Sequence, residues 1–164
     1  MAILFKKILV PTDNSENSRE AFKYAMNIAE IYEAIIYVVH VIDIDHLEEF
    51  YKFETSPYAS RVDMKENIVK KEMKETEEFI NKNIKGEKGL KIEKIIKKGN
   101  PFVKIIIAAR EIEADLIVMG THGRTGLFHV LMGSVAERVV RTAPCPVLTL
   151  KTKDFKFKLP CILV

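Results

Sequence analysis

The sequence predicts an α/β fold: one doubly wound domain with a five-stranded parallel sheet and helices on both faces. Short apolar runs alternate with longer amphipathic segments along the chain, a pattern typical of parallel sheets with right-handed crossovers. Polar or glycine-rich turns follow the first and fourth of these runs. The 164 residues, 48% of them apolar and 30% charged, suffice for one buried core.

The first strand and helix are predicted near the amino terminus. Residues 5–10, which end in the apolar Ile8-Leu9-Val10, predict a strand. Pro11 follows and cannot donate to a neighbouring strand, so we expect the strand to stop there. From residue 16 to 32, apolar side chains recur every three or four positions and predict an amphipathic helix. The polar turn 12–15 between them supplies the helix cap.

The next segments are predicted as a strand, a loop and a long helix. Residues 34–42 are almost continuously apolar, as expected of a strand covered on both faces. Residues 43–61 show no period, and Pro57 interrupts them, so we expect an irregular loop. Residues 63–85 are highly charged and predict a helix with one apolar face. That face would carry Ile68, Met73, Phe79, Ile80 and Ile84.

The clearest boundary in the second half is Gly99-Asn100-Pro101. Asn caps a helix and Pro fits its first position, so a helix is predicted from there to about residue 113. The remaining expected elements are strands at residues 90–97 and 116–119, a helix at residues 134–142, and a last strand that begins at Pro146 and ends at Leu150.

The turn after the fourth strand carries the pattern that indicates chemistry. Gly120 and Gly123 allow the backbone to approach a ligand closely. Further on, Gly133 and Ser134 open the predicted helix, with Ser134 as its expected N-cap. Because a helix start offers unpaired N–H groups and a positive dipole end, this spacing predicts a phosphate-binding turn.

The spacing G-x2-G-x9-G-S of these four residues resembles the nucleotide signature of the universal stress protein family, in its ATP-binding branch. Residues 8–15, His40-Val41 and residues 143–148 also resemble that family, in kind and in order. The resemblance covers roughly residues 3–151. It implies a nucleotide-binding domain over residues 1–151 and leaves residues 152–164 as a C-terminal tail.

The two suspected turns, after the first and fourth strands, can serve one ligand only if those strands are neighbours. The order 3-2-1-4-5 makes them neighbours at the switch point of a Rossmann-like sheet, where such folds bind ligands, and the resemblance implies the same order. It further implies ATP, with Mg²⁺ or Mn²⁺ held mainly by the phosphates, and a homodimer through the last strand. The nucleotide-binding residues it implies are Pro11, Thr12, Asp13, Val41, Met119, Gly120, His122, Gly123, Arg124, Gly133, Ser134, Val135 and Ala136.

Two of these residues have more than one interpretation. Asp13 would contact the ribose, or would cap the helix that follows it. His122 would donate a hydrogen bond in the phosphate loop, because no Ser, Cys or Asp at a suitable spacing completes a catalytic triad with it. We therefore expect no catalytic residue. The sequence also lacks the G-x-x-x-x-G-K-[ST] motif, so the lysine and hydroxyl of P-loop hydrolysis are not supplied.

Composition excludes several other classes. The formal charge of +3 and the spread of lysines among glutamates argue against nucleic-acid binding. The two cysteines do not have metal-ligand spacing, and no apolar run has membrane-spanning length. We expect a cytoplasmic, ATP-binding stress-response regulator or sensor. The alternatives are a slow ATPase, possibly needing a partner, and an interaction module whose glycines are only structural.

Overall fold

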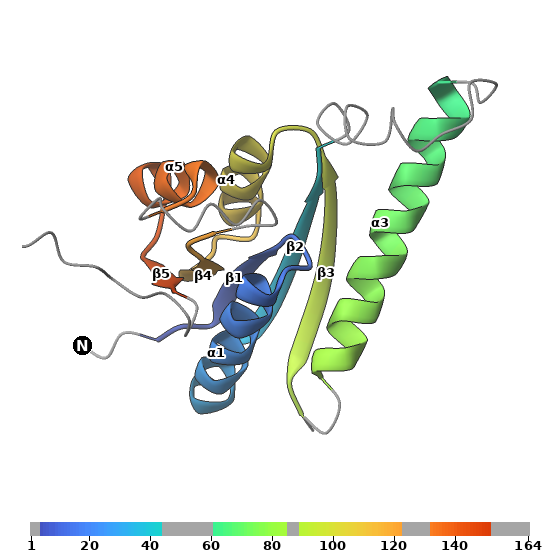
Figure 1. Cartoon of the computed structure of the whole chain (residues 1–164). Helices are drawn as coiled ribbons and strands as arrows, with labels where there is room; N and C mark the ends of the chain where they lie inside the picture. Colours follow the sequence, from blue (N-terminus) through green and yellow to red (C-terminus); the bar gives the residue numbers. More distant parts are fainter. Residues whose placement is uncertain (1–3, 44–60, 85–88, 123–131, 152–164) are drawn as a thin grey trace, which may run out of the picture.

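The structure is a computed structural model of the chain, which describes residues 4–43, 61–84, 89–122 and 132–151 (Figure 1). Of the loop predicted at residues 43–61, residues 44–60 lie outside the described residues, and Arg61 is already helical. The tail and the predicted site residues Gly123 and Arg124 also lie outside the described residues. The elements in chain order are β1 (Lys7–Thr12), α1 (Glu16–Tyr32), β2 (Ile35–Ile42), α3 (Arg61–Asn83), β3 (Lys91–Lys98), α4 (Pro101–Glu111), β4 (Leu116–Gly120), α5 (Ser134–Thr142) and β5 (Val147–Leu150).

The five strands form one parallel sheet in the order β3-β2-β1-β4-β5, which confirms the predicted fold and strand order. Side chains that alternate along the strands enter two separate cores. Ile8 and Val10 of β1 pack with residues of α1 and α3 on one face, whereas Leu9 packs with residues of α4 and α5 on the other. Figure 1 shows these helix pairs on opposite sides of the sheet.

The predicted end of the first strand was wrong. Pro11 lies within β1 and pairs in register with Val39 of β2, and the strand continues to Thr12. The register of β1 with β4 covers only Ile8 and Leu9. At Pro11 the strand therefore pairs on its β2 side, and the missing N–H breaks no bond of the β4 ladder.

The predicted apolar face of α3 was partly wrong. Ile68, Phe79 and Ile80 are buried, but Met73 is 45% exposed. The buried face of the helix instead includes Glu72 and Thr76. Polar groups can occupy such positions when they are hydrogen-bonded, and both are bonded here. Among the described helices, none is both long and apolar enough to cross a membrane.

Candidate functional site

The carboxyl ends of β1 and β4 lie side by side in the middle of the sheet. The chain leaves β1 toward β2 on one side, while β4 and β5 lie on the other side. This divergence is the switch point at which doubly wound folds bind ligands. Three segments meet there: the turn after β1, the turn after β4 and the start of α5.

The turn after β1 is organised by short side chains. The Asp13 carboxylate accepts hydrogen bonds from the backbone N and the hydroxyl of Ser15, at 3.1 and 2.5 Å. Ser15 is the N-cap of α1 and accepts a bond from the backbone N of Ser18. Asn14 takes a left-handed conformation with φ of 64°, and its backbone N donates to the Thr12 hydroxyl at 3.0 Å. Asp13 thus supports the cap of α1, and its carboxylate lies at the switch point.

The turn after β4 is packed directly against the first turn of α1. A Cβ added at Gly120 would lie 3.0 Å from the Asn17 Cβ and 3.2 Å from the Asn17 backbone. The Asn17 side-chain amide donates to the backbone carbonyl of His122 at 3.1 Å. This close approach requires glycine at position 120, and it joins the ends of β1 and β4 into one surface.

The start of α5 is fixed to the same turn by the backbone. Gly133 N donates to the Thr121 carbonyl at 2.7 Å, and an added Cβ at Gly133 would lie 3.1 Å from that oxygen. The prediction that Ser134 caps α5 was wrong: Gly133 is the N-cap and Ser134 is the first helical residue. Ser134 is exposed. The non-helical cap conformation falls one residue earlier, at Gly133, whose backbone N is bonded to the Thr121 carbonyl.

The start of α5 differs from those of the other helices whose N-caps are described. Ser15 caps α1 and Asn100 caps α4 through their side chains. No side chain caps α5 among the described residues. The first N–H groups of a helix have no partner within the helix, so those of Ser134, Val135 and Ala136 are available to an anion. The residues present therefore fit a phosphate group.

The other predicted residues lie around this point. Pro11 and Thr12 are buried at the end of β1, and Met119 is buried at the end of β4. Val41 is half-buried near the end of β2. The His122 Nδ1 lies 2.9 Å from the Thr121 hydroxyl. The structure thus brings the described predicted residues to one edge of the sheet.

Sequence reasoning missed Asn17 and Thr121, which join the three segments. Asn17 contacts the backbone of the β4 turn, and Thr121 bonds both Gly133 and Leu150 of β5. A weak signal existed for Asn17, because Asn has a low helix propensity. Nothing in the sequence distinguishes Thr121 from an ordinary turn residue.

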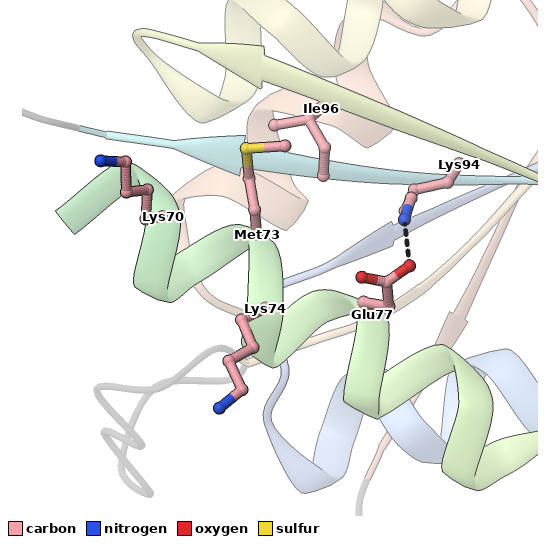
Figure 2. Close-up of a pocket in the computed structure, with 6 residues that line it drawn as sticks. All are labelled: Lys70, Met73, Lys74, Glu77, Lys94 and Ile96. Carbon is pink, nitrogen blue, oxygen red and sulfur yellow. Dashed lines mark hydrogen bonds and ion pairs between the residues drawn. The ribbon is translucent and has the colours of Figure 1, made fainter. Parts of the chain in front are cut away.

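Away from this site, a hollow lies between α3 and β3, at the edge of the sheet (Figure 2). Its volume is about 270 Å³, and its cations are largely paired: Lys94 bonds Glu77 at 3.1 Å, and Lys74 lies 3.8 Å from Glu78. The lining lysines Lys70, Lys74 and Lys94 and the carboxylate of Glu77 carry a formal net charge of +2, which neighbouring Glu78 lowers to +1. Within the described ranges, no cluster of three or more His, Cys, Asp or Glu side chains could hold a metal ion.

Comparison with known proteins gives a consistent result. The model of the universal stress protein family matches residues 4–151. Universal stress protein MJ0531 of Methanocaldococcus jannaschii is 40% identical over 148 residues, which cover 90% of this chain and 83% of the relative. Universal stress protein MJ0577 of the same organism is 35% identical over 163 residues, covering 94% and 99%.

Solved structures share the fold. The structure of MJ0577 superposes with a TM-score of 0.75 at 30% identity and covers 93% of this chain and 99% of that one. The universal stress protein from Archaeoglobus fulgidus, solved in complex with dAMP, gives a TM-score of 0.56 at 21% identity, covering 90% and 98%. At that identity the second likeness shows the fold alone.

Proposed function

This chain belongs to the universal stress protein family, and we propose that it binds ATP at the switch point and acts as a nucleotide-dependent regulator or sensor in a stress response. The observation that carries the proposal is the start of α5. Within the described part of the chain no side chain caps this helix, and the bond from Gly133 N to the Thr121 carbonyl holds its start against the β4 turn.

The phosphates are assigned to this helix start. The N–H groups of Ser134, Val135 and Ala136 and the positive end of the helix dipole favour negative charge. His122, Gly123 and Arg124 follow β4 in sequence, and we assign them to the same phosphates. Mg²⁺ or Mn²⁺ would accompany ATP on the phosphates, since Mg²⁺ often binds in this way with few protein ligands.

The nucleoside is assigned to the ends of β1 and β2. The Asp13 carboxylate, already oriented by Ser15, would accept hydrogen bonds from the ribose. Pro11, Thr12, Val41 and Met119 would enclose the base. The Archaeoglobus fulgidus protein solved with dAMP has the same fold, but this assignment rests on the residues of this chain.

We further propose a cytoplasmic homodimer, with residues 1–151 as the nucleotide-binding domain and residues 152–164 as a tail. β5 is the terminal strand of the sheet, and all four of its residues are only half-buried in the single chain. An exposed apolar edge strand favours pairing with another strand. A second copy of β5 across a two-fold axis would satisfy that edge.

The substitution Ser134→Asp tests the site. Asp is tolerated in the first turn of a helix and interacts favourably with its dipole, so α5 should persist. The added carboxylate would repel the phosphates, and the Kd for Mg-ATP should rise at least about tenfold. The Kd is measured by calorimetric titration, after nucleotide released by denaturation has been identified by mass spectrometry.

The matched control is Val103→Asp. Val103 is 41% exposed in the first turn of α4, so this variant adds the same charge at the start of another helix. It should bind Mg-ATP with wild-type affinity. Equal affinities of the Ser134 and Val103 variants would contradict the phosphate assignment, and a wild-type protein that neither retains nor binds ATP would contradict the proposed function.

A further inference from the structure

We propose that Glu72, Thr76 and His40 are positioning residues that couple α3 to the nucleotide-binding turn after β1. This inference rests on the proposed function for its consequence, but the coupling itself is a property of the chain. It is carried by a buried polar network that joins α3, β2 and the turn at residues 12–14.

The network has two branches that end on the same turn. In the first, the His40 Nδ1 lies 2.8 Å from the Thr12 carbonyl, and its Nε2 lies 2.9 Å from the Glu72 carboxylate. In the second, the Asn14 side-chain amide donates to the Thr76 hydroxyl at 3.2 Å, and that hydroxyl donates to the Glu72 carbonyl at 2.8 Å. Asp13, the proposed ribose ligand, lies between the two points of attachment.

Because the groups in this network are buried, the loss of any one hydrogen bond would be costly. The side chains of His40 and Glu72 are 3% and 2% exposed, and Thr76 is fully buried. Water cannot replace a lost partner at such positions, and an unsatisfied buried polar group is costly. A displacement of α3 near Glu72 therefore has to displace the turn as well, or leave several polar groups without partners.

The chemistry of the first branch fixes its orientation. A carbonyl oxygen only accepts, so the His40 Nδ1 must carry a hydrogen to bond Thr12. The bond from Nε2 to Glu72 then needs one more hydrogen, on either the imidazole or the carboxyl group. A glutamine at position 72 would also satisfy this geometry, because its amide can donate to an unprotonated Nε2.

The two halves of α3 are held in different ways. Its carboxyl half is anchored by apolar packing: Phe79 and Ile80 belong to the core beside α1, and the rings of Phe22 and Phe79 lie 6.0 Å apart. Around the middle of the helix, hydrogen bonds of Glu72 with His40 and of Thr76 with Asn14 join α3 to the body of the domain. Occupancy of the nucleotide site, by ordering the turn, should therefore stabilise the middle of α3.

The decisive variant is Glu72→Met, which fills a similar volume but cannot bond His40. Glu72→Gln is the rescue variant, and Glu78→Met is the control, since it makes the same change at an exposed position of the same helix. Thr76→Val removes the hydroxyl group of the second branch and leaves the first branch intact. Each protein is assayed by Mg-ATP titration and by amide hydrogen exchange with and without ATP.

We expect Glu72→Met to weaken ATP binding about tenfold and Thr76→Val about fivefold. Glu72→Gln and Glu78→Met should stay within about twofold of wild type, a range too small to indicate coupling. ATP should slow exchange at residues 65–76 in the wild-type protein but not in Glu72→Met. Folded Glu72→Met and Thr76→Val proteins that bind ATP like Glu78→Met would overturn the coupling.

The ligand-free exchange separates this inference from the proposed function. The amides of Asn14 and Ser15 donate within the turn, so they report its order without any nucleotide. Faster exchange of these amides in Glu72→Met, but not in Glu78→Met, supports the coupling even if the wild-type protein binds no ATP. Equal exchange in the two variants refutes the coupling, whatever the protein binds.

Discussion

Replacement of Gly120 by Ala tests whether the close contact between β4 and α1 builds the site. The new Cβ would lie 3.0 Å from the Asn17 Cβ and 3.2 Å from the Asn17 carbonyl carbon and oxygen. None of these atoms can move by rotation of a side chain, so the first turn of α1 has to move away from β4. Overpacking of this kind costs about 1–3 kcal/mol, and each kcal/mol lowers the Tm of a domain of this size by about 2–4 °C.

The same displacement should impair the site. It would lengthen the 3.1 Å bond from the Asn17 amide to the His122 carbonyl. The turns after β1 and β4 would then no longer be held in the same relative position. We expect Gly120→Ala to lose both stability, measured by thermal unfolding, and Mg-ATP affinity, measured by calorimetric titration.

Gly89→Ala is the matched control. Gly89 has a φ of +97° with no atom within 4 Å of an added Cβ, so the substitution costs about 1–2 kcal/mol through backbone strain alone. It lies before β3, at the opposite edge of the sheet from the site, and should leave the ATP affinity unchanged. A Gly120→Ala protein with wild-type Tm would refute the packing argument. Equal ATP affinity of the two variants would refute the link between this contact and the site.

Two further predictions concern the other half of the sheet. Burial, and secondarily the charge of Asp115, raise the pKa of the Cys145 thiol, so less thiolate is present at a given pH. With Cys161 replaced by Ser, alkylation of Cys145 at pH 8 should be slower than alkylation of a free thiol. The additional substitution Asp115→Asn should make it faster. Thr149→Pro should give a folded monomer in sedimentation. The Leu150 carbonyl accepts a hydrogen bond from the backbone N of Thr121, directly after β4, so the Thr149 amide points to the outer edge, where proline blocks pairing with a second copy. A dimeric Thr149→Pro protein would exclude dimerisation through that edge, and alkylation at the rate of a free thiol would contradict the raised pKa.

The regular elements could be predicted because their signals are local. The limits of α1 were predicted to the residue, since its apolar period and the Ser15 cap are both read along the chain. Asn100 and Pro101 likewise begin α4 as predicted. The strand order followed from the need to place two distant turns together, and the described site residues do gather at one edge of the sheet.

Where prediction failed, the deciding contact came from a distant residue. Pro11 stays in β1 because its partner is β2 and not β4. Gly133 caps α5 because Thr121 fixes it. Neither fact leaves a trace in the local sequence, because the residues that impose it are more than ten positions away.

By itself the sequence determined the α/β fold, the family and the edge of the sheet to which we assign the ligand, since periodicity, caps and glycine spacing act over a few residues. Only the tertiary structure decided which polar groups are buried together. Glu72 looks like any other charge on a helix rich in Lys and Glu, and Asn17 looks like any polar residue near a cap. Their roles exist only because packing buries Glu72 beside His40 of β2 and brings the half-buried Asn17 within hydrogen-bond distance of the turn after β4.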